Sequence, residues 1–193
     1  MHAFCKILGI TKLKTENLIK MKKVLLTAAF AVAGMVGVSA QTTGVEGTVH
    51  VGIPVGETAD VSSFNIGVDL AYLHPIANNF KLGAKVGYDH FIGKEYKINN
   101  VVVAEKDDVG FIPLAATAKY EFGNNLFVGA DLGYAFATTD GYEGGLFWQP
   151  KIGYSASTWD LYAGYKGISA GPENNNTVDW KYNAVSVGFA YKF

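Results

Sequence analysis

The sequence has a single cysteine, Cys5, no arginine, and a charged fraction of only 17%. A disulfide framework and a cysteine-based zinc site are excluded, because one thiol can form neither. No basic patch is present, so we expect no nucleic-acid partner. The 23 glycines are spread along the chain and form no phosphate-binding loop ahead of a helix. Soluble domains carry about 25% charged residues. The lower fraction in this chain indicates that it need not be an ordinary globular protein with a charged surface.

The first 40 residues form a segment of their own. Residues 21–40 contain two lysines, an apolar stretch and the small residues Val38-Ser39-Ala40. This layout is typical of a secretory signal peptide, and the apolar stretch of about 15 residues is short for a membrane span of about 20. We predict cleavage before Gln41, with a retained membrane anchor as the alternative. Residues 1–20 are interpreted as an over-called start or an extended n-region, so the mature protein lacks Cys5.

From residue 41 to residue 193, apolar residues alternate with small or charged ones at a period of two, which indicates two-faced β-strands. Eight segments do so, each longer than the usual strand of about 5 to 6 residues and close to the length of about 9 to 11 residues that crosses a membrane. The segments are 45–53, 64–72, 80–89, 112–122, 126–136, 146–154, 159–166 and 185–193. Short connections at 77–79, 123–125 and 156–158 alternate with longer ones at 56–61, 93–109, 138–144 and 169–181. This asymmetry is typical of outer-membrane barrels.

The apolar face is predicted to point outward. An eight-stranded barrel has an interior that side chains just fill, so roughly 40 apolar residues do not fit inside, whereas glycines and a few long charged chains do. Tyrosines fall in two rings, as expected of aromatic girdles at two membrane interfaces. The girdle residues are Tyr72, Tyr120, Tyr154 and Tyr191 near the short turns, and Tyr88, Tyr134 and Tyr165 near the long loops. The alternative, a soluble lipocalin-like barrel with an apolar pocket, requires the opposite facing.

These features together resemble the small eight-stranded outer-membrane barrels of the OmpA/OmpX type, which include opacity-like proteins. The resemblance covers essentially all of 41–193 and includes the terminal pattern Val185-x-Val187-x-Phe189-x-Tyr191-x-Phe193. It implies an all-β fold, an eight-stranded antiparallel up-and-down transmembrane β-barrel in the outer membrane of a Gram-negative cell. It also implies that the barrel-assembly machinery recognises Phe189, Tyr191 and Phe193. The resemblance is specific for architecture and weak for activity.

Inward-facing charges are balanced, with six acids and six lysines. Buried charges are tolerated when they are paired, so we expect salt bridges to fill the lumen. A conducting pore, the alternative, favours a surplus of one sign and a wide lumen. The predicted network consists of Glu46, Asp69, Asp89, Glu121, Asp131, Asp160, Lys81, Lys85, Lys119, Lys151, Lys166 and Lys192.

The long connections carry ten acids and four lysines, so they hold the whole negative surplus of the mature chain. Glu105, Asp107 and Asp108 match no known cation-binding spacing, and a solvated acidic loop is favoured over a metal site. The loops also contain apolar residues that we expect to fold over the barrel mouth, with contact to a partner as the alternative. These are Tyr96, Val101, Val102, Val103, Tyr142 and Trp180.

The predicted mature chain contains three histidines that could act as catalytic groups. His74 is assigned to a short turn, and His50 is assigned to the polar filling of the lumen. His90, on the outward face near the loop end, is the only candidate base, with Ser62 and Ser63 on the neighbouring strand. None of the three is followed two residues later by serine, the arrangement that lipid A deacylases of this size show. We therefore predict a non-enzymatic protein with no catalytic residue, no cofactor and no metal.

The resulting prediction is a monomeric, porin-like outer-membrane barrel at the cell surface. Its predicted partners are outer-membrane lipid, lipopolysaccharide and the barrel-assembly machinery. Its predicted role is structural or a surface interaction through loops 93–109 and 169–181. A narrow pore or a barrel that handles small solutes or lipids is the main alternative, and a lipid A modifying hydrolase is a weaker one.

Overall fold

Eight long strands form one closed barrel in the computed structural model, which describes residues 44–98, 101–139, 142, 144–170 and 180–193. Side chains of residues 95–98, 101–105, 170 and 180 are not described. The predicted signal peptide and residues 1–20 lie outside the described residues. The barrel strands are β1 (Val45–Pro54), β2 (Ser62–Ala77), β3 (Phe80–Gly93), β6 (Val109–Glu121), β7 (Leu126–Ala137), β8 (Gly145–Ser155), β9 (Trp159–Ala170) and β10 (Trp180–Lys192).

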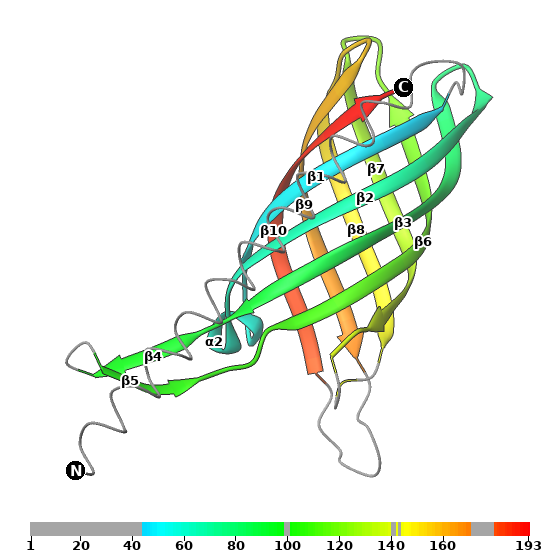
Figure 1. Ribbon diagram of the computed structural model, residues 1–193. Coiled ribbons are helices and arrows are strands. Elements are labelled where there is room, and N and C mark those ends of the chain that lie inside the picture. Colours follow the sequence, from blue (N-terminus) through cyan, green and yellow to red (C-terminus); the bar gives the residue numbers. More distant parts are fainter. Residues whose placement is uncertain (1–43, 99–100, 140–141, 143, 171–179) are drawn as a thin grey trace, which may run out of the picture. The chain divides into compact units, whose positions relative to one another are not determined.

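Every barrel strand pairs antiparallel with its two neighbours, in the order β1-β10-β9-β8-β7-β6-β3-β2 (Figure 1). The first and last strands close the ring, with Glu46 opposite Lys192 and Val51 opposite Val187. One bond beyond this ladder, the Phe193 amide donates to the Val45 carbonyl at 3.0 Å. Closure leaves the barrel no unpaired edge strand, which removes the usual site of edge-to-edge association. The predicted fold class, an eight-stranded antiparallel up-and-down β-barrel, is therefore confirmed.

Two ends of the barrel differ in their connections (Figure 1). At one end the strands are joined by tight turns, where Asn125 takes a left-handed backbone conformation with φ of 64°, which asparagine tolerates. We call this the short-turn end and the other the loop end. The prediction that His74 lies in a short turn was wrong. β2 extends to Ala77, and His74 pairs with Leu82 inside the β2–β3 ladder.

Two elements at the loop end were not predicted. The connection at 56–61 contains a four-residue helix, α2 (Thr58–Val61), which is shorter than the window in which helical periodicity can be detected. The connection at 93–109 contains a hairpin of β4 (Glu95–Ile98) and β5 (Val101–Glu105), which pair antiparallel as a separate two-stranded sheet. Nowhere in the described ranges is a helix both long and apolar enough to cross a membrane.

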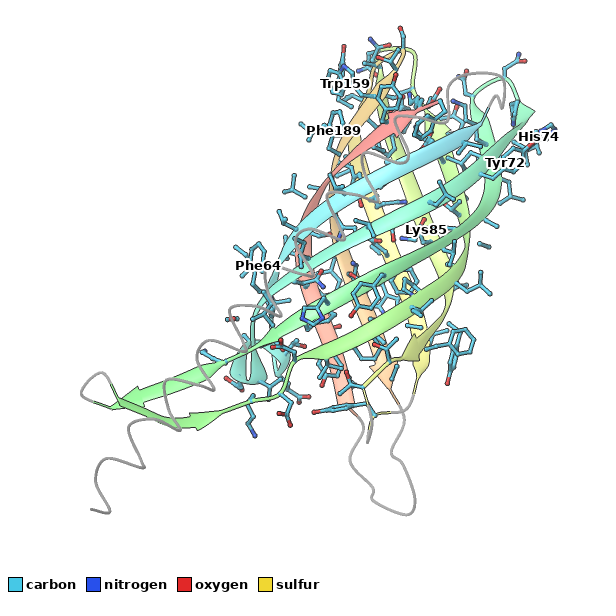
Figure 2. All side chains as sticks on the ribbon, in the orientation of Figure 1. Phe64, Tyr72, His74, Lys85, Trp159 and Phe189 are labelled. Carbon is cyan, nitrogen blue, oxygen red and sulfur yellow. The ribbon has the colours of Figure 1, made fainter. Side chains whose placement is uncertain are left out.

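The two faces of the barrel have opposite composition. Outward side chains are large and apolar and lie exposed along every strand, including Leu114, Leu132 and Ile152 at 54–60% exposure. Figure 2 shows Tyr72 and Phe189 pointing away from the barrel wall and Lys85 pointing into the interior. Inward positions are buried and hold most of the charged residues of the strands. The alternative of an apolar interior behind a polar surface is therefore excluded.

Candidate functional site: the barrel interior

All twelve charged residues predicted for the lumen lie on the inward face, and each makes at least one ion pair. The pairs separate into two groups along the barrel axis. The loop-side cluster consists of Asp69, Lys85, Asp89, Asp131, Lys151 and Lys166 together with His50. The turn-side cluster consists of Glu46, Lys81, Lys119, Glu121, Asp160 and Lys192. Each cluster contains three acids and three lysines. The charges of the turn-side cluster therefore balance, and those of the loop-side cluster balance when His50 is neutral.

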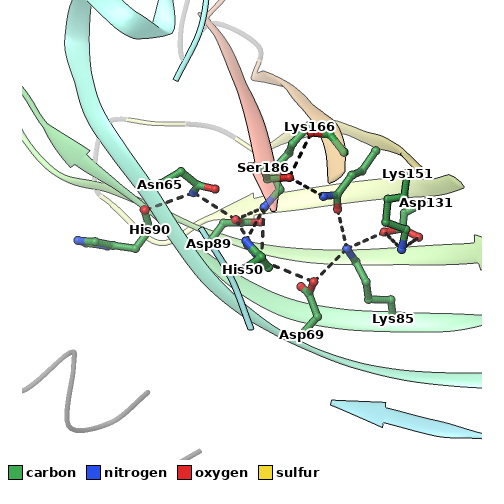
Figure 3. Close-up of polar contacts among 12 residues, drawn as sticks. His50, Asn65, Asp69, Lys85, Asp89, His90, Asp131, Lys151, Lys166 and Ser186 are labelled. Carbon is green, nitrogen blue, oxygen red and sulfur yellow. Dashed lines mark hydrogen bonds and ion pairs between the residues drawn. The ribbon is translucent and has the colours of Figure 1, made fainter. Parts of the chain in front are cut away.

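The loop-side cluster spans the full width of the lumen (Figure 3). Lys166 on β9 pairs with Asp89 on β3, and these two strands lie on opposite sides of the eight-stranded ring. All atoms of both side chains are buried. His50 lies beside this pair, with Nε2 3.7 Å from Asp89 Oδ1 and 3.6 Å from Asp69 Oδ2. A buried charge is tolerated at such a position only because its partner reaches it across the lumen.

Lys85 links the second half of the loop-side cluster. Its Nζ lies 2.7 Å from Asp131 Oδ2 and 3.3 Å from Asp69 Oδ2, and it donates to Gln149 Oε1 at 3.1 Å. Gln149 in turn donates to the Ser186 hydroxyl at 3.3 Å. The two neutral residues extend the network from β3 through β8 to β10. The predicted network of charges omitted them, because a polar side chain on an inward face gives no sequence signal of its partner.

The turn-side cluster is centred on Lys119. This residue pairs with Asp160 on β9, with Glu121 at 3.4 Å and with Glu46 at 3.5 Å. Lys192 pairs with Asp160 at 2.7 Å. Solvent reaches this cluster more readily than the loop-side one, because the Lys81–Glu121 pair at its outer end is 29% exposed on both side chains. The interior therefore becomes drier from the short turns towards the loops.

A small cavity lies between the two clusters, with a volume of about 30 Å³. Its wall includes Asp69 and Lys85 from the loop-side cluster and Glu46, Lys119 and Asp160 from the turn-side cluster. A cavity of this size holds about two or three water molecules, since each needs about 10–15 Å³ of such volume. It has no room for an organic substrate. Among the described residues, no group of three or more His, Asp or Glu side chains is arranged to hold a metal ion.

Glycines on the inward face provide the space that the long interior side chains occupy. The ring of Tyr162 lies over Gly188, where an added Cβ would be 2.3 Å from Tyr162 Cζ. The imidazole of His50 lies over Gly67 in the same way, at 2.4 Å. These glycines are needed because a side chain there would collide with the filling of the lumen, which explains why glycine accumulates on this face.

Replacing Gly188 by alanine should therefore lower the free energy of unfolding by about 1–3 kcal/mol, the usual cost of overpacking. Gly123→Ala is the matched control, because an added Cβ at Gly123 meets no atom within 4 Å. Urea unfolding in lipid vesicles, followed by tryptophan fluorescence, measures both changes. Equal stability of the two variants would contradict the assignment of Gly188 as a space-making position.

The loop end of the lumen is apolar, although the inward face was predicted to be small and charged. We call this layer the apolar plug; it consists of Phe91, Val109, Phe111, Phe147, Ile168 and Tyr182, all at most 2% exposed. The rings of Phe91, Phe111 and Tyr182 come from β3, β6 and β10, and their centroids are 5.1–6.0 Å apart. Tyr142, from the 138–144 connection, packs against Tyr182 at 6.3 Å. Of the loop residues expected over the mouth, Tyr142 is the one whose side chain is described.

The short helix α2 is fastened to the same end. The Thr58 hydroxyl donates to the Lys181 carbonyl at 2.8 Å and accepts from the Asn183 amide at 2.7 Å. Lys94 donates to the Ala59 carbonyl at 3.0 Å. These bonds connect the 56–61 connection to β10 and to the end of β3. The loop end is therefore tied together by polar contacts outside the plug.

His90, the candidate catalytic base, lies on the outward face as predicted, and the partners of its two ring nitrogens among the described residues are not serines. Its Nδ1 is 3.3 Å from the Tyr88 hydroxyl, and its Nε2 is 3.3 Å from Asp108 Oδ2. Ser63 donates instead to the Ile92 carbonyl at 3.3 Å, and Ser62 is buried opposite Gly93. Asp108 also accepts from the Gly93 amide at 2.8 Å. The arrangement holds the base of the 93–109 connection against β3.

Six of the seven predicted girdle tyrosines are exposed on the outward face: Tyr72, Tyr120, Tyr134, Tyr154, Tyr165 and Tyr191. Tyr88 is partly covered by its stacking on His90, with ring centroids 6.1 Å apart. The predicted assembly residues Phe189 and Tyr191 also face outward, and the ring of Phe189 stacks on Trp159 at 6.1 Å. Phe193 contacts Tyr191 edge to face at 5.1 Å. The aromatic residues thus continue around the short-turn end.

Neither a protein-family model nor a curated protein matches the sequence. Three solved structures with a similar fold are Neisserial surface protein A, Ail of Yersinia pestis and OprG of Pseudomonas aeruginosa. Neisserial surface protein A is 19% identical with a TM-score of 0.46, over 80% of this chain and 99% of that one. Ail is 14% identical with a TM-score of 0.46, over 78% and 99% of the two chains. OprG is 11% identical with a TM-score of 0.43, over 80% and 98%. Among proteins of known structure, this chain is similar in fold to small eight-stranded outer-membrane β-barrels.

Proposed function

We propose that the protein is an outer-membrane β-barrel, without enzymatic activity, that acts structurally or through its surface loops. The observation that carries the location is the continuous apolar outer surface. Monomeric soluble proteins rarely expose apolar patches larger than a few hundred Å², whereas here large apolar side chains are exposed on all eight strands. The tyrosines at both ends of this band support a position in a lipid bilayer.

The filled interior supports a role that does not involve transport. Ion pairs cross the lumen between opposite strands, and the apolar plug closes the loop end. A conducting pore needs a wide lumen and weak, multiple ion sites. The surroundings of His90, which include Asp108 and Tyr88 and no described serine, likewise favour a structural role over hydrolysis of lipid A. The acidic loops remain as the surface available to partners.

The location and the closed lumen are tested on the purified protein. We expect it to fractionate with outer membranes, to shift in gel mobility on heating, and to show no stable unitary conductance in planar bilayers. Soluble fractionation or the absence of a heat-dependent shift would refute the barrel location. Regular unitary steps from the pure protein would support the narrow-pore alternative instead.

A shortened protein distinguishes the structural role from the surface-interaction role. Deleting residues 95–105 removes β4 and β5, which pair only with each other in the described sheets, so the barrel should fold and keep its heat-dependent shift. Cells that lack the protein and carry the shortened form are then compared for detergent sensitivity. Restored resistance indicates a structural role of the barrel, whereas failure of a folded barrel to restore it places the role in the loop.

A further inference from the structure

The interior of this barrel is closed differently at its two ends. At the loop end, the apolar plug is packed from β3, β6, β8, β9 and β10, and its large side chains are at most 2% exposed. At the short-turn end, Lys81 and Glu121 are each 29% exposed, and Lys192 is 17% exposed. Exposure then falls to zero at Lys166 and Asp89, directly below the plug. Solvent thus approaches the charged clusters from the short-turn end.

The two closures have different physical properties. Charged and polar side chains attract water and small ions, and a network of ion pairs can exchange partners while staying solvated. An apolar constriction excludes water, because no polar group there replaces the hydration shell of an ion. The plug contributes six large apolar or aromatic side chains in one layer, and the described rings contact one another across the lumen. It is therefore the more effective barrier of the two.

The small cavity fits this division. It lies on the short-turn side of the loop-side cluster and is lined by Thr117, Lys119, Phe127 and Asp160 among others. Ser186 is joined to the loop-side cluster through Gln149. It lies two residues along β10 from Ala184, which packs with the plug residues, and it is 1% exposed. The two positions thus sample the chamber and the layer immediately below the plug.

We propose that the apolar plug seals the lumen against the loop side, and that the polar interior is a chamber open only at the short-turn end, whose inner limit is the fully buried Lys166–Asp89 pair of the loop-side cluster. Small ions from the short-turn side enter as far as the cavity. None passes to the loop side while Phe91, Phe111 and Tyr182 remain packed. The proposal depends on the interior alone, so it holds or fails independently of the proposed surface role.

Thiol accessibility to silver ions tests the proposal on the full chain in detergent micelles, where both ends of the barrel face the reagent. In a Cys5→Ser background, Thr117→Cys places a thiol at the cavity and Ser186→Cys places one below the plug. We expect the thiol at position 117 to react and the thiol at position 186 to be slower by about tenfold or more. Folding of each variant is checked by heat-dependent gel mobility.

Opening the plug should change only one of the two rates. Tyr182→Ala removes a ring from the plug, so we expect the thiol at position 186 to react about tenfold faster and the thiol at position 117 to keep its rate. Val185→Ala is the matched control, because Val185 is on the same strand and faces outward at 49% exposure. It should leave both rates unchanged.

Each other outcome overturns the proposal. An unreactive thiol at position 117 means that the short-turn end is closed as well. A thiol at position 186 that reacts rapidly in the unmodified barrel means that ions pass either the plug or the loop-side cluster. If Tyr182→Ala has no effect, or accelerates both thiols equally, the barrier lies in the network or in the whole wall.

Discussion

Replacing Lys166 by methionine is expected to lower the free energy of unfolding by about 3–5 kcal/mol, because it leaves Asp89 as an uncompensated charge in the driest layer of the lumen. Both side chains are fully buried, and the pair joins opposite strands of the ring. Among the described residues, Asp89 then keeps only the neutral Asn65 amide, which donates to Oδ1 at 3.2 Å, and His50 at 3.7 Å, because Lys85 is already engaged with Asp69 and Asp131. Urea unfolding in lipid vesicles, followed by tryptophan fluorescence, measures the loss.

Two further variants separate the buried charge from a general loss of packing. Lys81→Met removes a lysine from the same strand as Asp89, where the pair is partly exposed, so its cost should be about 1 kcal/mol or less. Combining Lys166→Met with Asp89→Leu removes both buried charges and should recover most of the lost stability. A Lys166→Met variant as stable as Lys81→Met would mean that Asp89 is hydrated in the folded barrel.

The second large effect concerns the outward face. Leu132→Arg is expected to lower the free energy of unfolding by about 2–4 kcal/mol in lipid vesicles, the usual cost of arginine on a barrel surface at the bilayer midplane. Leu132 lies at the middle of β7, points outward and is 60% exposed. On the surface of a soluble protein, the same substitution would change stability by about 0.5 kcal/mol or less.

Leu126→Arg is the control for Leu132→Arg. Leu126 is on the same face of the same strand, at its short-turn end, and is 43% exposed. Near a membrane interface arginine costs about 0–1 kcal/mol. The loss in free energy of unfolding should therefore be several times larger for Leu132→Arg than for Leu126→Arg. If both are harmless, the apolar band is not in contact with lipid.

The alternation of residue types was enough to predict the eight strands and their facing. In β10, for example, Val185, Val187 and Phe189 are exposed outward, while Ser186 and Ala190 are buried inward. This prediction succeeds because a strand has a side-chain period of two and one face of each strand meets a different medium. The composition of the inward face also indicated a narrow, filled lumen.

The apolar plug was missed for a physical reason. Phe91, Phe111 and Tyr182 are aromatic residues on the inward face near strand ends, and their alternation does not differ from that of charged lumen residues. They form one layer only because the registers of β3, β6 and β10 bring them to the same depth. Register between distant strands is not encoded in any one segment. For the same reason, Lys166 and Asp89, 77 residues apart in sequence, were both predicted to face the lumen, but their pairing with each other was not predicted.

The hairpin in the 93–109 connection has a sequence pattern from which it could have been predicted. Glu95-Tyr96-Lys97-Ile98 alternates, Val101-Val102-Val103 has high strand propensity, and Asn99-Asn100 between them is turn chemistry. The helix α2 had none, since four residues cannot display a helical period.

The turn-side cluster has a consequence for how this barrel completes its folding. Glu46 belongs to the first strand and Lys192 to the last, and they face each other across the seam that closes the ring. Lys119, from the opposite part of the ring, pairs with Glu46 and with Asp160. In an open sheet Asp160 keeps Lys192, which is on the neighbouring strand β10, but Lys119 is far from both Glu46 and Asp160. The Lys119–Glu46 and Lys119–Asp160 pairs form only when the seam closes, so sealing of the first strand to the last is coupled to pairing of the interior charges.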